Sequence, residues 1–97
     1  MENFFKRRID ELDDKVSKIF NYMDNENHLY YICGKNDESM FDNLIIRFLT
    51  VSLMNNDEYN SFFGKNQDKF MEGFNEVIDF RHDKWYNEYR KRFCKAS

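Results

Sequence analysis

The sequence contains no proline, three glycines and two cysteines among its 97 residues. Proline and glycine form most of the tight turns between short strands, so their scarcity argues against a turn-rich β-sandwich and favours helices joined by short polar loops. Two cysteines, Cys33 and Cys94, are too few for a disulfide scaffold or for a metal site made of cysteine alone. We therefore expect both to be free thiols of a cytosolic protein.

Long apolar runs are absent as well. The most apolar run, residues 44–54, is much shorter than the roughly 20 apolar residues that cross a membrane, and Arg47 interrupts it. Residues 1–14 lack the apolar core of a signal peptide. The sequence therefore predicts no membrane partner and a cytoplasmic location, which would be the host cytoplasm if the protein is viral.

Catalytic motifs are also missing. The chain has no glycine-rich phosphate loop, no HExxH and no CxxC spacing. His82 lies near Asp79 and Asp83 at a spacing that resembles half of the carboxylate–histidine pairs of metal-binding helical bundles, but no Glu-x-x-His pair completes it. We therefore expect no enzymatic activity, no catalytic residue, no cofactor and no bound metal.

Helical periodicity is present, most clearly at residues 39–54, where apolar side chains recur at the i, i+3, i+4, i+7 spacing of a helix face. The face is formed by Phe41, Leu44, Ile45, Phe48, Leu49 and Leu53 and is widened by Met40, Ile46, Val51 and Met54. Little of the circumference is left for water, so we expect a central helix that is buried on most sides. Ser39 and Asp42 have the spacing of a capping box at its start.

Residues 2–23 carry an apolar seam with alternating steps of four and three. The seam consists of Phe5, Ile9, Leu12, Val16, Ile19 and Met23. It predicts a helix that either pairs with a second copy in a coiled coil or packs within its own chain. Packing against residues 39–54 is favoured, because the seam is close to the shortest length that supports a coiled coil and a helix face must be buried somewhere.

Three further segments complete the predicted fold. Residues 29–33 could form a strand or a short helix, and we favour a helix that ends at Gly34 because no partner strand is evident. Residues 55–57 are expected to end the central helix and to cap a short helix that stops at Gly64. Residues 67–93 are expected to form one long helix.

Together these segments predict a single all-α domain that spans residues 1–97. Its architecture would be a compact bundle of four to five helices with a long C-terminal helix. A chain of this length supports one modest core but not two. Aromatic residues make up 19% of the chain, which is more than such a core can hide, so we expect some of them at a contact surface.

The second half of the long helix, residues 79–93, is aromatic and basic on all sides. Protein interfaces and their hot spots are enriched in Trp, Tyr, Phe and Arg. The residues predicted to bind a partner are Arg81, Trp85, Tyr86, Tyr89, Arg92 and Phe93. An acidic stripe on the same helix could meet a basic groove, although a solvated helix face is the simpler interpretation. The stripe consists of Asp68, Glu72, Glu76, Asp79 and Asp83.

The chain has many Asn and Lys residues and a single Ala, Ala96, which is typical of AT-rich genes such as those of low-GC bacteria and their phages. We expect a small non-enzymatic protein-interaction module, namely a phage or mobile-element accessory protein that inhibits a host or defence enzyme through residues 79–93. Self-association as a homodimer is compatible with this role. The alternative is a nucleic-acid-binding protein that uses residues 81–95, with cations on phosphates and aromatic rings stacked on bases.

Overall fold

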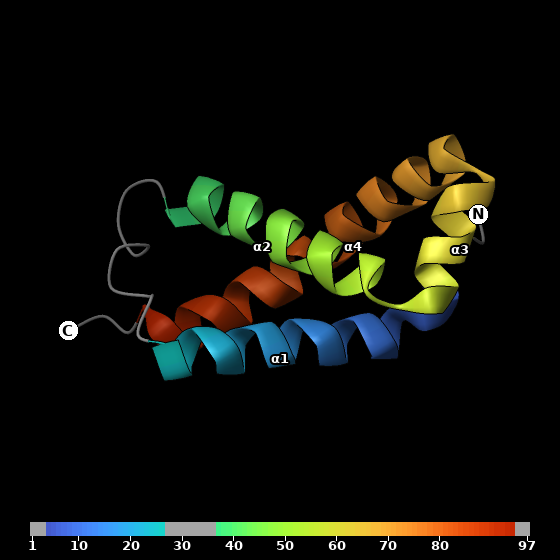
Figure 1. Cartoon of the computed structure of the whole chain (residues 1–97). Helices are drawn as coiled ribbons and strands as arrows, with labels where there is room; N and C mark the ends of the chain where they lie inside the picture. The colour runs from blue at the N-terminus through green and yellow to red at the C-terminus, as the bar shows by residue number, and fades with distance from the viewer. Residues whose placement is uncertain (1–3, 27–36, 95–97) are drawn as a thin grey trace.

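The computed structural model describes residues 4–26 and 37–94. The helices in these two segments are the 3-10 helix η1 (Lys6–Arg8) and the α-helices α1 (Ile9–Glu26), α2 (Asp37–Met54), α3 (Asp57–Lys65) and α4 (Gln67–Phe93). The described part of the chain contains no strand. The predicted all-α bundle with a long C-terminal helix is therefore confirmed (Figure 1).

The helices are arranged along one long axis of the molecule. In Figure 1, α1 and α4 both run from the end that carries α3 toward the opposite end, and α2 returns in the other direction. The molecule is 47 Å long. At a rise of about 1.5 Å per residue, the 27 residues of α4 cover most of that length. The long C-terminal helix is thus the element against which both ends of the bundle pack.

Two asparagine caps define the short helix and the start of α4. The side chain of Asn56 accepts hydrogen bonds from the backbone N–H groups of Glu58 (3.0 Å) and Tyr59 (3.4 Å). Asn66 accepts one from Lys69 N–H at 3.1 Å. Each cap satisfies N–H groups that have no partner within the helix. The predicted cap at residues 55–57 is confirmed, and α3 ends one residue beyond Gly64.

Helix starts and ends differ from the predictions elsewhere. The predicted capping box is wrong, because α2 begins at Asp37 and both Ser39 and Asp42 lie inside it. Asp37 occupies the first turn, where the helix dipole favours a carboxylate. The first helix runs to Glu26, three residues beyond Met23, where the predicted seam ends. The prediction for residues 29–33 lies outside the described residues.

The predicted seam of the first helix is buried within the chain. Its side chains are buried except for Ile9, which is half-buried. Packing inside the bundle, which was favoured over a coiled coil, is therefore confirmed. The core consists of Phe5, Leu12, Val16, Ile19, Phe20, Met23, Phe41, Ile45, Leu49, Leu53, Tyr59, Phe70, Phe74, Val77, Trp85 and Tyr89.

The prediction that residues 39–54 are buried on most sides is wrong. Only one stripe of α2 faces the core, and Met40, Ile46 and Val51 are 44%, 43% and 58% exposed. The reason is geometric, because the neighbouring helices cover α2 from one side and no other helix in residues 4–26 and 37–94 covers the opposite side. Apolar composition here exceeds what the fold buries.

The prediction of free cysteines is also wrong. Cys94 is disulfide-bonded, and no described cysteine is free. Cys33, the other cysteine of the sequence, lies outside the described residues. Disulfides persist in oxidising compartments and are rare in the cytosol, so this bond removes the support that free thiols gave to a cytosolic location. No helix in residues 4–26 and 37–94 is long and apolar enough to cross a membrane.

Candidate interaction surface

The C-terminal half of α4 does not present the aromatic surface expected from the sequence. Trp85 and Tyr89 are 1% and 0% exposed and belong to the core. The ring of Tyr89 lies 5.0 Å from that of Phe41 and 6.0 Å from that of Phe20. Burial raises the pKa of Tyr89 to about 12. These two residues are therefore not available to a partner in the folded protein.

The carboxylate of Asp13 in α1 binds three side chains from this half of α4. Trp85 Nε1 donates a hydrogen bond to Asp13 Oδ1 at 2.7 Å, and Arg81 donates two to the same carboxylate, one of them from Nε at 3.2 Å. Lys84 Nζ lies 3.4 Å from Asp13 Oδ2. Burial alone would raise the pKa of Asp13, but the hydrogen bonds from Arg81 and Trp85 outweigh it and lower that pKa.

Asp37, at the start of α2, also binds side chains of α4. This carboxylate is 6% exposed. It accepts a hydrogen bond from Tyr86 Oη at 2.9 Å and a second one from Arg90. Buried carboxylates require partners of this kind because their desolvation is costly. Tyr86 and Arg90 are therefore structural links between α4 and α2.

The last two residues predicted to bind a partner also have contacts within the chain. Arg92 donates a hydrogen bond to Asn21 and lies 3.9 Å from the carboxylate of Asp24. Phe93 is half-buried, with its ring 5.9 Å from that of Phe20. The expectation that the six predicted residues form one free surface is therefore wrong, because each of them contacts side chains of α1 or α2. The six are Arg81, Trp85, Tyr86, Tyr89, Arg92 and Phe93.

His82 joins α4 to α2 on another face of the helix. Its Nε2 lies 2.7 Å from Asp42 Oδ1 and 3.6 Å from Glu38 Oε2, and its Nδ1 lies 3.2 Å from Asp83 Oδ1. Burial opposes protonation, but the hydrogen bond to Asp83 and the charges of Asp42 and Glu38 outweigh it and raise the pKa of His82. Among the residues described, no group of three His, Cys, Asp or Glu side chains could hold a metal ion.

This histidine predicts a pH dependence of stability. Because its folded-state pKa is raised, the stabilisation from His82 is complete below its ordinary pKa of 6.5 and is lost as the pH rises through the folded-state value. Asp13 acts in the opposite sense: its stabilisation is present above the ordinary pKa of 3.8 and is lost as the pH falls through its lowered value. We expect the free energy of unfolding, measured by urea titration, to peak between these two limits.

The matched variant for this test is His82→Gln, which keeps a polar side chain but cannot titrate. We expect it to remove the decline in stability above pH 6.5 and to leave the decline in acid unchanged. If the free energy of unfolding of His82→Gln still falls above pH 6.5, groups other than His82 cause the decline.

The predicted acidic stripe lies on the outer side of α4. Asp68, Glu72, Asp79 and Asp83 are exposed. Glu76 is half-buried, and its Oε1 lies 3.5 Å from Lys6 Nζ. Four of the five carboxylates therefore face solvent, as a solvated helix face and a contact surface would both require.

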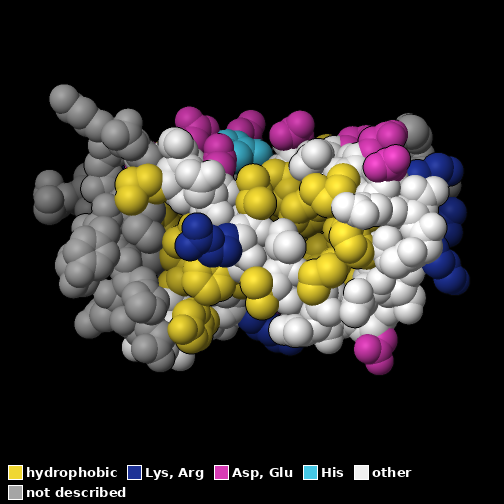
Figure 2. Space-filling model, turned by 45° about the horizontal axis from the view of Figure 1, so that its top comes forward, with side chains coloured by type: hydrophobic (Ala, Val, Ile, Leu, Met, Phe, Trp, Pro, Cys, Tyr) yellow, Lys and Arg dark blue, Asp and Glu magenta, His cyan; other side chains and the backbone are white. Residues whose placement is uncertain are grey.

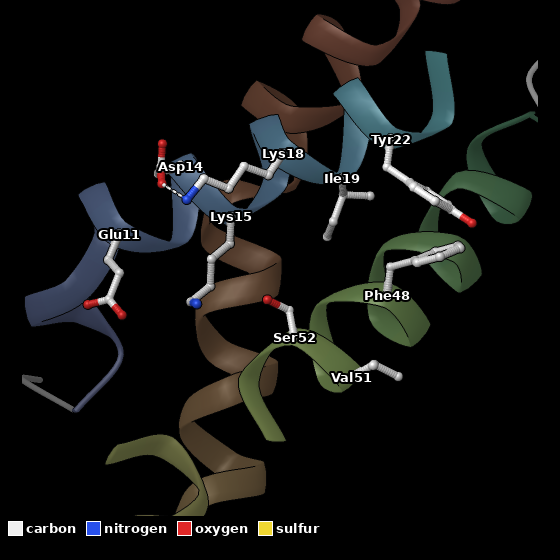
Figure 3. Close-up of a pocket in the computed structure, with 9 residues that line it drawn as sticks. All are labelled: Glu11, Asp14, Lys15, Lys18, Ile19, Tyr22, Phe48, Val51 and Ser52. Atoms are coloured by element: carbon white, nitrogen blue, oxygen red, sulfur yellow. Dashed lines mark ion pairs between the residues drawn. The ribbon is translucent and has the colours of Figure 1, made fainter. Parts of the chain in front are cut away.

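Packing within the described residues leaves several large apolar side chains exposed on the face formed by α1 and α2. A hollow of about 600 Å³ lies between these two helices. Its lining consists of Glu11, Asp14, Lys15, Lys18, Ile19, Tyr22, Phe48, Val51 and Ser52. Figure 3 shows Tyr22 and Phe48 side by side at one end, with ring centroids 6.1 Å apart, and Lys15 and Ser52 facing the space between the helices.

A second hollow, of about 260 Å³, continues along α2 from Phe48 toward Met40. The exposed and half-buried apolar side chains along the two hollows form what we name the apolar strip. The strip consists of Tyr22, Met40, Leu44, Phe48 and Val51. Figure 2 shows apolar side chains gathered across one face of the molecule and acidic side chains along its upper edge. In the sequence, the only sign of this strip is the excess of apolar residues in 39–54, which the sequence analysis interpreted as core.

Comparison with known proteins finds no match. This holds for the protein-family models, for the curated proteins and for the solved structures.

Proposed function

We propose that the chain is a small protein-interaction module that binds a protein partner through the apolar strip of α1 and α2. The observation that carries the proposal is the exposure of large apolar side chains on one face: Tyr22 is 49% exposed, Met40 44% and Val51 58%. Contiguous apolar surface that is rimmed by polar residues is typical of interaction sites. Tyr, Phe, Met and Arg, which are enriched in interfaces, all occur along the two hollows.

Inhibition of a host or defence enzyme, predicted from the sequence, is part of the same proposal and depends on this surface. Nucleic-acid binding through residues 81–95 receives less support. Trp85 and Tyr89 are buried, and Arg81 already pairs with a carboxylate. Stacking on bases and pairing with phosphates both require free groups. The cytosolic location stays a prediction.

Site-specific photo-crosslinking in cells that make the protein tests the proposal. A benzophenone amino acid replaces Val51 in the strip or, as the matched control, Met71, which is 42% exposed on α4. We expect discrete crosslinked protein bands from position 51 and none of the same bands from position 71.

A second pair of variants checks that the crosslink depends on the strip. Tyr22→Asp, at a 49% exposed position in the strip, is expected to abolish the bands from position 51, and Phe80→Asp, at a 61% exposed position outside it, is expected to leave them. Equal bands from positions 51 and 71 would overturn the proposal.

A further inference from the structure

We infer that the groove between α1 and α2 receives an amphipathic α-helix of the partner protein, with carboxylates along the flank of that helix. The inference rests on the proposed function and names the chemical class of the partner. It follows from three properties of the groove, which are its charge, its length and its incompatibility with a second copy of the same surface.

The charge of the groove is unlike that of the whole chain. The chain has a formal net charge of −3. The two hollows are lined by three cations, Lys15, Lys18 and Arg47, and by two carboxylates, Glu11 and Asp14, which leaves an excess of one positive charge. Lys18 pairs with Asp14 at 3.2 Å. Neither Lys15 nor Arg47 has an ion-pair partner in residues 4–26 and 37–94, and Lys15 is half-buried with its Nζ 5.9 Å from the centre of the Tyr59 ring.

An ammonium group that has no ion-pair partner and is half-buried beside apolar side chains is less screened by water than one at an open surface, so its attraction to a partner carboxylate is stronger. Glu11, which lines the groove one turn before Lys15, would repel a second carboxylate next to it. The partner's acidic flank is therefore placed over Lys15 and Arg47. Its basic or neutral end is placed near Glu11.

The length of the apolar strip matches a short helix. Met40, Leu44, Phe48 and Val51 follow one another at steps of four, four and three along α2, a distance of roughly 16 Å at 1.5 Å per residue. A helix laid in a groove contacts it through residues at i, i+3, i+4 and i+7. About three turns of a partner helix would cover the strip and occupy the side of α2 that the described helices leave uncovered.

A second copy of the same surface, paired about the middle of the strip, would not satisfy these charges. A two-fold contact places one patch against itself. Arg47 lies near the middle of the strip, so two Arg47 side chains would meet without a carboxylate between them. An acidic helix from a different protein supplies the missing charges.

A designed peptide pair tests the inference. The first is a fluorescein-labelled 18-residue helix with Leu at i, i+3, i+4 and i+7 and Glu on the flanks, and the second has Lys in place of each Glu. Fluorescence anisotropy follows binding of both to the full chain at low salt. We expect the Glu peptide to bind at least tenfold tighter than the Lys peptide, with the difference shrinking as salt screens the charges.

Charge reversal in the protein provides the decisive control. Lys15→Glu combined with Arg47→Glu is expected to lower the affinity for the Glu peptide at least tenfold and to raise the affinity for the Lys peptide. Lys69→Glu combined with Lys91→Glu changes the net charge equally at exposed sites outside the groove, and we expect it to leave the preference for the Glu peptide intact. Circular dichroism confirms that each variant is folded.

Three outcomes would overturn the inference. One is equal affinity for the two peptides. Another is an affinity for the Glu peptide that stays the same when the charges at residues 15 and 47 are reversed. The third is concentration-dependent self-association that Val51→Asp abolishes, since a second copy would then occupy the strip. If crosslinking from Val51 succeeds while the peptide test fails, only the chemistry of the partner is wrong. If the crosslinking fails, the proposed function itself fails.

Discussion

Trp85→Ala is expected to lower the free energy of unfolding by about 3–5 kcal/mol, which is the usual cost of removing a large buried aromatic side chain. Trp85 is 1% exposed and lies among the core side chains. Its removal leaves a cavity and deprives Asp13 of the hydrogen bond that Trp85 Nε1 donates at 2.7 Å. The free energy of unfolding of a small domain is about 5–15 kcal/mol in total. The variant should therefore be close to unfolding at 25 °C.

Urea titration followed by circular dichroism measures this loss without depending on tryptophan fluorescence. Phe80→Ala is the matched control, because Phe80 lies on the same helix and is 61% exposed. We expect its effect to stay within about 0.5 kcal/mol. If the two variants had equal effects, Trp85 would not be part of the core, and the surface predicted from the sequence would be restored.

Periodicity in the sequence was sufficient to predict most of the fold. The seam from Phe5 to Met23 is regular enough to define both a helix and its buried face. The long helix predicted for residues 67–93 is α4, Gln67–Phe93, in the structure. These features depend on contacts within a few residues of the chain, which a sequence displays directly.

The burial of α2 could not be predicted in the same way. Apolar residues surround much of this helix, and composition alone indicates that it is central. Which side is covered depends on where α1 and α4 pack. The exposed apolar strip, and therefore the candidate site, is a consequence of tertiary packing and has no local signal beyond an excess of apolar residues.

The segment from Arg81 to Phe93 was misinterpreted for a related reason. Trp85 and Tyr89 are spaced at i and i+4 on the face that Val77 begins, so their burial was visible in the pattern. Arg81 lies on the same face and was counted with them among the residues predicted to bind a partner. A cation on a buried face needs a carboxylate opposite it, and the sequence does not show that Asp13 lies there, 68 residues earlier in the chain.

Asp13→Ala is expected to lower the free energy of unfolding by about 2–3 kcal/mol, because hydrogen bonds to charged groups are each worth about 1.5–3 kcal/mol and solvent screens part of this site. The variant leaves the buried Trp85 Nε1 without an acceptor and Arg81 without its carboxylate. Urea titration at neutral pH measures the loss. We expect it to shrink in acid, where the wild-type carboxylate is itself protonated.

A double-mutant cycle separates the ion pair from the tryptophan contact. If Arg81 and Asp13 act as one unit, Asp13→Ala combined with Arg81→Ala costs less than the sum of the two single changes. Asp10→Ala is the matched control, since Asp10 is an exposed carboxylate on the same helix, and we expect its effect to stay within about 0.5 kcal/mol. Additive losses from Asp13→Ala and Arg81→Ala would show that the two side chains stabilise the fold independently. In that case the basic side chains of α4 would not be held by α1, and the argument that this half of the helix is closed to partners would rest on the burial of Trp85 and Tyr89 alone.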